Sequence, residues 1–539
     1  MKYGFVIDNR KCIGCHACTT ACKSEHDVPV GVNRTWVKQV EKGTFPNTRR
    51  VFSVMRCNHC TDAPCVEICP VEALFFRQDG IVDFDKDRCI GCKSCMQACP
   101  YDALYIDPET HTAAKCNYCA HRIDIGLEPA CVNICPEHAI ISGDMEDPES
   151  EIFSLLNRQQ VTVRKSEKGT KPNLFYINGD EASLNPIATE KSDNYFWSSQ
   201  STGVGHFAKY AEKMADSSDI VQMALKLNGQ GVSKEEASNS KNLKSVDVLM
   251  GKARRTYDAP DKGILWGWEV SAYVFTKAIA AGVFLIPFLA WFFQKVTFTP
   301  SIEWLTIITA MVALVLTGAL LVKDLDQPSR FLYVLLRPQW SSWLVKGGYA
   351  ITAYGGLLTL IGILTFLGLN GFSTPVMWVT ALTAVFTAVY TAFLFAQAKG
   401  RDFWQSPTLA IHMLVHSIMA GAAIFLIAGQ VMELGSDWIG FSTFALKGAI
   451  GLNLVVILAE LLTPHPTESA KLTVDMITKG RYSRQFWAGA IMVGNIIPLA
   501  VVVFLPTLPA LAVAGVLTLI GIYITEHIWV EAPQRLALS

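Results

Sequence analysis

The chain has 539 residues, a formal net charge of -1 and 51% hydrophobic residues. A net charge near zero gives no basic surface for nucleic acid, so no nucleic-acid partner is expected. The averages conceal a division, because residues 1–263 carry 67 of the 93 charged side chains and all 16 cysteines, whereas residues 264–539 carry 26 charged side chains and no cysteine. This division predicts a soluble, cysteine-rich part followed by a membrane part.

The first residues, MKYGFVIDNRKC, have neither the apolar core of a signal peptide nor a twin arginine. Dense cysteine without a secretion signal favours metal ligation over disulfide bonds. The cysteines form four runs of four: Cys12, Cys15, Cys18, Cys22; Cys57, Cys60, Cys65, Cys69; Cys89, Cys92, Cys95, Cys99; and Cys116, Cys119, Cys131, Cys135.

The spacing within these runs is typical of bacterial ferredoxins. The first and third read C-x2-C-x2-C-x3-C, and the other two widen only the middle gap. The later three runs end in Cys-Pro and continue with VEAL, YDAL and EHAI, which is an internal repeat. We therefore predict four [4Fe–4S] clusters, in preference to paired-cysteine zinc sites. CIGCH also matches a c-type haem attachment motif, but further cysteines follow it at once, so no haem is expected.

Residues 1–145 resemble the iron–sulfur electron-transfer subunits of molybdopterin oxidoreductases, such as polysulfide, dimethyl sulfoxide and tetrathionate reductases. The resemblance implies an α+β, ferredoxin-like double dicluster domain, a molybdopterin-containing catalytic partner, and a role in the respiration or oxidation of sulfur compounds. It also implies that the fourth cysteine of each run serves another run's cluster. The implied ligand sets are Cys12, Cys15, Cys18 with Cys135; Cys116, Cys119, Cys131 with Cys22; Cys57, Cys60, Cys65 with Cys99; and Cys89, Cys92, Cys95 with Cys69.

Residues 146–263 show weak periodicity and polar runs such as EKGTKPN, so we predict an irregular wrap around the ferredoxin-like core and then a linker. No complete G-x-G-x-x-G and no P-loop occurs in the chain, so neither NAD nor flavin is expected.

Residues 264–539 are predicted to form an all-α bundle of eight transmembrane helices. The apolar stretches lie at about 264–293, 304–322, 344–369, 375–398, 408–434, 439–462, 485–505 and 508–530. Loops on the ferredoxin side carry nine Lys or Arg residues, and the opposite loops carry only Lys295. The positive-inside rule then predicts a multi-pass protein of the inner (plasma) membrane, in contact with lipid, with a cytoplasmic ferredoxin domain. The alternative is a periplasmic domain, with the basic loops docking its acidic surface.

This part resembles the haem-free, quinone-reactive membrane subunits of the NrfD/PsrC type, through WGWEVSAYVFTKAIAAG, KDLDQPSRFL and AKGRDFW. The family commonly has Asp-Leu-Gly-Arg-Pro where this chain has DLDQP, which keeps Asp324 but loses the arginine. The resemblance implies that the entry end of the first span lines a pocket for menaquinone or ubiquinone.

Titratable residues inside spans are costly and indicate function. Glu269, Tyr273 and Lys277 follow one another at i, i+4 and i+8 on one helix face. We predict that Tyr273 bonds a quinone carbonyl, that Glu269 exchanges its proton, and that Lys277 offsets negative charge. The alternative is an interfacial Glu269 with Lys277 snorkelling or paired to it.

Four further residues are candidates for proton exchange. Asp324 ends the second span and either lines the pocket or pairs with Lys323. His412 and His416 stand one turn apart on the fifth span, where they form a hydrogen-bonded core pair or a relay, and Glu460 in the sixth span is a similar relay candidate. The expected function is a non-catalytic or quinone-reactive subunit that carries electrons between the catalytic partner and the quinone pool. The alternatives are a proton-translocating module with regulatory clusters, and a simple cluster-bearing anchor.

Overall fold

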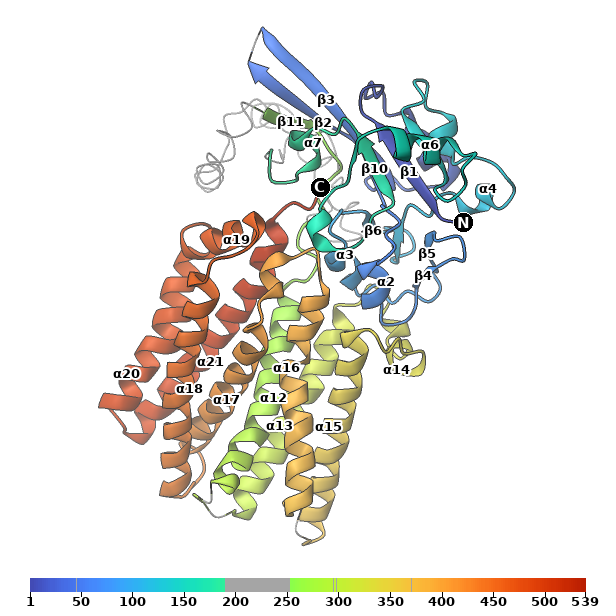
Figure 1. The fold of residues 1–539 in the computed structure, drawn as a ribbon. Helices are drawn as coiled ribbons and strands as arrows, with labels where there is room; N and C mark the ends of the chain where they lie inside the picture. The colour runs from blue at the N-terminus through green and yellow to red at the C-terminus, as the bar shows by residue number, and fades with distance from the viewer. Residues whose placement is uncertain (45, 190–252, 294, 297, 370) are drawn as a thin grey trace, which may run out of the picture. The chain divides into compact units, whose positions relative to one another are not determined.

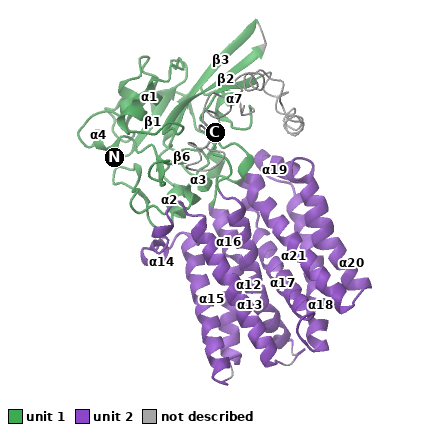
Figure 2. Cartoon of the chain, turned by 180° about the vertical axis from the view of Figure 1, so that it is seen from behind, with its two compact units in different colours: residues 1–265, 398–401, 534–539 green, residues 266–397, 402–533 purple. Residues whose placement is uncertain are grey.

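The computed structural model describes all residues except 45, 190–252, 294, 297 and 370. The chain divides into two compact units (Figure 2). The first comprises residues 1–265, 398–401 and 534–539, and the second comprises residues 266–397 and 402–533. The predicted boundary at residue 263 lies two residues from the observed one. The sequence does not predict that residues 398–401 and 534–539 belong to the first unit.

The first unit is built around β1 (Tyr3–Asp8), whose sequence YGFVID is buried from Phe5 to Asp8. The strand order of its sheet is β8-β1-β10-β9, with β8 antiparallel and β10 parallel to β1. The partner strands are β8 (Ile140–Asp144), β9 (Val161–Thr162) and β10 (Leu174–Ile177). Because hydrophobic strands that are covered on both faces read as continuous apolar runs, β1 lacks the alternation of an exposed strand.

A second sheet has the order β11-β2-β3 and is antiparallel throughout. Its strands are β2 (Thr35–Thr44), β3 (Asn47–Arg56) and β11 (Ala253–Tyr257). Two small hairpins complete the ferredoxin-like part, and they pair β4 (Leu74–Phe76) with β5 (Val82–Phe84) and β6 (Leu104–Ile106) with β7 (Ala113–Lys115). The short helices beside them are α1 (Ala17–Glu25), α2 (Pro64–Ile68), α3 (Ser94–Ala98), α4 (Ala120–Ile123) and α5 (Ala130–Asn133).

The stretch predicted to be an irregular wrap contains regular structure wherever it is described. It forms α6 (Glu151–Arg158), the strands β9 and β10, α7 (Glu181–Leu184) and β11. Strand β10 is only four residues long, so its periodicity is too short to be recognised, yet it pairs with β1 and buries Leu174 and Tyr176 in the core. The expectation of irregular structure was therefore wrong for these residues, and its part over residues 190–252 lies outside the described residues.

Among its described residues, the second unit contains eight helices that are long and apolar enough to cross a membrane, as predicted (Figure 1). They are α12 (Trp268–Phe292), α13 (Pro300–Lys323), α15 (Trp343–Phe366), α16 (Thr374–Gln397), α17 (Leu409–Ala428), α18 (Ser436–Leu462), the continuous pair η4 (Gln485–Ile496) and α20 (Ile497–Phe504), and α21 (Leu508–Glu531). The seventh span thus begins as a π-helix and continues as an α-helix.

Helix α12 is the centre of this unit and packs against α13, α16, α17 and α21. Its crossing with α17 is made by two glycines, Gly282 and Gly421. A Cβ on Gly282 would lie 1.8 Å from the carbonyl oxygen of Ser417, and one on Gly421 would lie 2.1 Å from that of Gly282. Small residues at such positions let two helix backbones approach closely. The crossing therefore brings the titratable side chains of α12 and α17 into one interior.

Candidate functional sites

The structure gathers the first three cysteines of one run with the last cysteine of another run. One cavity in the first unit is lined by Cys12, Cys15 and Cys18 and by Cys135, the last cysteine of the fourth run. A second cavity is lined by the third run's first three cysteines and by Cys69, the last of the second run. We name these set A (Cys12, Cys15, Cys18, Cys135) and set D (Cys89, Cys92, Cys95, Cys69).

The remaining eight cysteines gather in the same crossed manner. Cys22 of the first run interacts with Cys116, Cys119 and Cys131, and we name these four cysteines set B. Cys99 of the third run interacts with Cys57, Cys60 and Cys65, and we name these four set C. The sets also adjoin one another in a row, because Cys18 neighbours Cys131, Cys57 neighbours Cys116, and Cys65 neighbours Cys95. The order is therefore A, B, C, D.

Local backbone geometry explains why the thiols of one run converge. Gly14 and Gly91 stand between the first two cysteines of their runs with φ of 71° and 69°. His16 and Lys93 also adopt positive φ, immediately before α1 and α3. These left-handed residues fold each loop back before the helix begins, which a chain of ordinary φ cannot do in so few residues.

The repeat after Cys-Pro has a structural meaning. The amide of Ala73 in VEAL donates to the Cys69 sulfur at 3.2 Å, and that of Ala139 in EHAI donates to the Cys135 sulfur at 3.2 Å. The Ala103 amide of YDAL approaches Cys99 in the same way. The fourth cysteine of each of the later three runs thus receives an N–H bond from four residues ahead, and hydrogen bonds to ligand sulfur are one means of adjusting cluster potential.

The environment of the cysteines suits thiolates that are bound to metal. Burial raises the pKa of Cys18 and of Cys92 to about 12, so a free thiol at either position holds its proton. Ligation to iron removes that proton and compensates the charge. His26 places Nε2 3.2 Å from the Cys119 sulfur, and burial lowers the pKa of this imidazole to about 4, which leaves a neutral ring beside set B.

Two short segments that follow membrane spans in the sequence, residues 398–401 and 534–539, belong to the first unit and bind next to set C. Gly400, in the AKGRDFW motif, donates its amide to the Gln97 carbonyl at 3.1 Å. The Arg401 Nε atom donates to Gln97 Oε1 at 2.9 Å, and Gln97 Nε2 donates to Gln534 Oε1 at 2.5 Å. A Cβ on Gly400 would lie 2.9 Å from the carbonyl oxygen of Cys99, so only glycine fits there.

In the second unit, the three titratable residues of α12 have separate environments. Lys277 is fully buried and donates to Thr391 Oγ1 at 2.6 Å, with its Nζ 4.7 Å from the centre of the Tyr390 ring. Tyr273 is also buried and adjoins Tyr390 and Thr391. The expected alternative of a Lys277 that snorkels or pairs with Glu269 was therefore wrong.

Glu269 and Asp324 lie at the ends of their helices. Glu269 is half-buried and places Oε1 3.8 Å from Lys323 Nζ, which also lies 4.1 Å from the centre of the Trp268 ring. Lys323 thus pairs with Glu269. Asp324 caps α13 and is close enough to Tyr273 to interact electrostatically.

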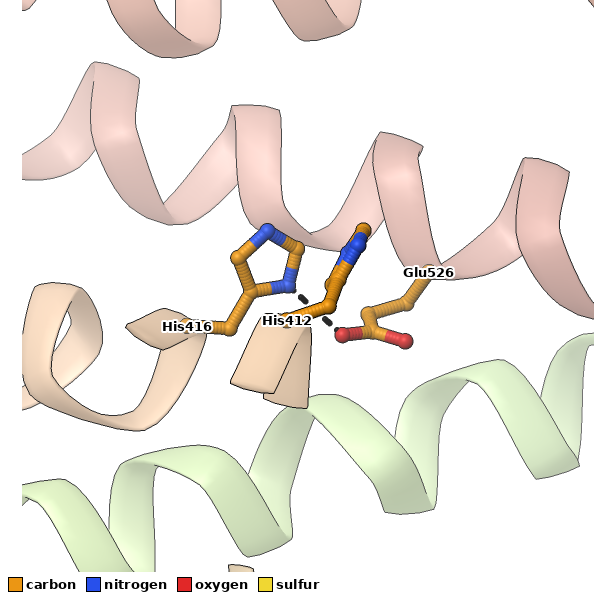
Figure 3. A group of neighbouring side chains, drawn as sticks. All are labelled: His412, His416 and Glu526. Carbon is orange, nitrogen blue, oxygen red and sulfur yellow. Dashed lines mark hydrogen bonds and ion pairs between the residues drawn. The ribbon is translucent and has the colours of Figure 1, made fainter. Parts of the chain in front are cut away.

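His412 and His416 lie in the interior of the bundle, and each bonds a different buried carboxylate. His412 Nδ1 is 2.9 Å from Glu460 Oε2. His416 Nδ1 is 2.7 Å from Glu526 Oε1 (Figure 3). The two imidazole rings have centroids 4.3 Å apart. Glu460 also accepts bonds from Thr408 Oγ1 and Trp529 Nε1, both at 3.0 Å. Four titratable groups from three helices therefore form one buried assembly.

The assembly extends to α12, because Glu526 interacts electrostatically with Lys277. One nitrogen of each histidine and an oxygen of Glu526 also lie within 4.8 Å of one another, a donor set that suits zinc. Here, however, Glu526 is already bonded to the His416 nitrogen (Figure 3). We call this assembly the span network, and its members are Lys277, Glu526, His416, His412 and Glu460.

Two functional candidates were missed from the sequence. Glu526 in ITEHIW is an acid within an apolar span, and the rule that selected Glu460 would have found it. Arg56 is a fully buried guanidinium among the cysteines, and no local signal distinguishes it from the exposed arginines before it in TRRVFSVMR.

Comparison with known proteins identifies both units. Residues 259–535 match the family model described as polysulphide reductase, NrfD. The protein belongs to the NrfD family. In addition, residues 11–74 and 48–145 of this NrfD-family chain match two models described as 4Fe-4S dicluster domains. The protein is therefore an integral membrane protein that also carries [4Fe–4S] clusters.

Curated relatives resemble the iron–sulfur part. The chain is 46% identical over 190 residues to a tetrathionate reductase subunit of Salmonella typhimurium, which covers 34% of this chain and 76% of the relative. It is 43% identical over 181 residues to a polysulfide reductase component of Wolinella succinogenes, covering 33% and 94%. It is 33% identical over 225 residues to the arsenate respiratory reductase iron-sulfur subunit of a Shewanella species, covering 33% and 96%. This NrfD-family chain thus joins an electron-transfer subunit and a membrane anchor in one polypeptide.

Proposed function

We propose that the chain conducts electrons between a molybdopterin-containing catalytic subunit and the membrane quinone pool, with one [4Fe–4S] cluster in each of sets A to D. The observation that carries this proposal is the row of four crossed cysteine sets, since adjoining sets give a path for single electrons. Quinone chemistry needs two electrons and two protons, and the span network supplies buried groups that hold and exchange protons.

The catalytic partner is proposed to dock over set A. Cys15 is exposed, and beside this set lie two large apolar side chains, Ile13 at 54% and Ile134 at 50% exposure. Exposed apolar side chains beside a cofactor are suited to a protein interface. Two relatives are named for the reduction of tetrathionate and of polysulfide, so we propose a sulfur compound as the substrate that such a partner reduces; the third is named for arsenate, which is the alternative substrate.

The quinone is proposed to bind beside Tyr273 and Lys277 on α12. The phenol of Tyr273 is suited to donate a hydrogen bond to a quinone carbonyl oxygen. The ammonium of Lys277 is suited to offset the negative charge of a reduced quinone. Glu269 and Asp324 are proposed to exchange protons at the helix ends. From Lys277, the span network offers a route through Glu526 and the two histidines to Glu460. Menaquinone and ubiquinone share the carbonyl chemistry that this site would recognise.

The proposal is tested by electron exchange between quinol and clusters in the purified, iron-replete protein. Addition of a quinol analogue is expected to reduce clusters, as followed by EPR and visible absorbance. K277M is expected to slow this reaction at least tenfold without loss of iron. The matched control is K447M, because Lys447 also lies within a span but has an exposed side chain.

The outcomes separate the proposal from its alternatives. If quinol never reduces the clusters in the wild-type protein, the quinone-oxidoreductase function is wrong, and a simple anchor or a module with regulatory clusters takes its place. Iron well below about sixteen atoms per chain in an anaerobic preparation contradicts one four-iron cluster in each set. Equal rates for K277M and K447M contradict the quinone site while leaving the cluster path intact.

A further inference from the structure

Arg56 is a charged side chain in the interior of the iron–sulfur unit. It is the last residue of β3 and is 0% exposed. Its guanidinium carbon lies 4.3 Å from the centre of the Phe5 ring, and its Nη2 atom donates to Thr35 Oγ1 at 3.2 Å. Its Nε and Nη1 atoms are buried and have no hydrogen-bond partner in protein oxygen or nitrogen among the described residues.

The surroundings of this guanidinium are cysteines rather than carboxylates. Among the described residues, none forms a salt bridge with Arg56, whereas the thiols of Cys131, Cys116 and Cys18 all interact with it. The first two belong to set B and the third to set A. Burying a cation without a compensating partner is strongly unfavourable. Anionic clusters in these two sets supply the compensation that the protein does not.

Lys115 is a second buried cation, and it interacts with set C, which follows set B in the row. Lys115 is 0% exposed, donates from Nζ to the carbonyl oxygens of Val82 and Cys116, and interacts with Cys57 and Cys65 of set C. Both cations adjoin set B, but Arg56 also interacts with set A, whereas Lys115 interacts with set C. This difference provides a comparison within the same unit.

We propose that Arg56 is a redox-tuning residue whose fixed positive charge raises the reduction potentials of the two clusters in sets A and B together. The inference rests on the cluster assignment proposed above. Reduction adds one negative charge to a cluster, and a cation nearby in a poorly screened interior favours that state. Because arginine does not lose its proton in proteins, the effect is constant across the working pH range.

The residue also couples the two clusters in a way that a surface charge cannot. It neighbours cysteines from both sets, so a single substitution is expected to change two potentials out of four. Lys115 is expected to act on set C, so its substitution changes a different part of the row. Arg50 lies on the same strand with 56% side-chain exposure and pairs with Glu41, so its charge is screened by solvent.

The experiment is an EPR-monitored redox titration of the full-length, iron-loaded protein and its variants. In R56Q, two of the four midpoints are expected to fall, each by at least a tenfold change in the reduction equilibrium, which is about 59 mV for a one-electron couple. R56K keeps the charge and is expected to keep both midpoints near the wild-type values. K115M is expected to lower a different midpoint, and R50Q none. The R56Q shift is expected to be the same at pH 6 and pH 9.

The result has clear contrary outcomes. Iron-replete R56Q with four unchanged midpoints overturns the proposal. An equal shift in R56Q and R56K also overturns it, because the planar geometry of the guanidinium, rather than its charge, would then set the potentials. If R56Q does not retain iron, R56K decides: wild-type iron and midpoints support a required charge, whereas loss of iron in both variants makes Arg56 a packing residue. Failure of the cluster assignment is distinguishable, since it lowers the iron content of the wild-type protein itself.

Discussion

Gly282→Ala is expected to destabilise the membrane unit although alanine is the better helix former. The added methyl group would lie 1.8 Å from the carbonyl oxygen of Ser417, where ordinary contact begins at 3.4 Å. Helices α12 and α17 would have to separate by roughly 1.6 Å, and backbone atoms cannot rotate away as a side chain can. Overpacking of this kind costs about 1–3 kcal/mol, and we expect the upper part of that range.

The matched control is Gly318→Ala in α13. A Cβ at this glycine meets nothing within 4 Å, so the substitution carries only the gain in helix propensity, about 1 kcal/mol. The same gain applies to Gly282→Ala and leaves a net cost of about 1–2 kcal/mol. The two variants should therefore differ by about 2–3 kcal/mol in opposite directions from wild type.

The assay is thermal unfolding of the purified protein in detergent, followed through its buried tryptophans. A difference of this size corresponds to about 5–10 °C in Tm for a unit of this length. Gly282→Ala should also slow reduction of the clusters by quinol, because the crossing holds Lys277 of α12 and the two histidines of α17 in one interior. If Gly282→Ala unfolds at the same temperature as Gly318→Ala, the close approach of α12 and α17 is wrong.

The remaining predictions concern cluster ligation, proton exchange and orientation in the membrane. Cys22→Ser should remove iron from set B while leaving the cluster of set A, and spectra that lose the set A signal instead would contradict the crossed ligation. Glu526→Gln should slow quinol-driven cluster reduction at least tenfold at unchanged iron content, with Glu433→Gln in a loop as the control; equal rates would exclude the span network from proton exchange. Protease should not cut residues 146–263 in right-side-out vesicles, and cutting there would place the iron–sulfur unit outside the cytoplasm.

The sequence predicts the cysteine sites well because ferredoxin spacing is local. Two-residue gaps and the Cys-Pro repeat lie within a few residues of one another, and the structure brings Cys135 to Cys12 as the family resemblance implies. The eight spans are also local, since each is a continuous apolar stretch. In contrast, Arg56 becomes distinctive only when β3 packs among thiols that lie up to 75 residues away in the sequence.

The three titratable residues of α12 show, within one helix, the same limit of prediction from local sequence. Periodicity correctly places Glu269, Tyr273 and Lys277 on the helix that begins at Trp268, but their partners come from other helices. Glu269 pairs with Lys323 of α13, and Lys277 bonds Thr391 of α16. No spacing rule along one span predicts which side chain a neighbouring span will present, so the contacts of Glu269 and Lys277 become visible only in the fold.

The three-part composition of the iron–sulfur unit has a consequence for synthesis. Residues 1–265 leave the ribosome first, but Gln97 bonds Arg401 and Gln534, which are made after the fourth and eighth spans. The unit therefore cannot acquire its last contacts until every span has been translated. Cluster insertion into the early part can precede those contacts, so an unfinished chain would carry iron before its final segments lock into place. Closure of the iron–sulfur unit is therefore a late step in the folding of the chain, and it requires translation of the whole membrane part.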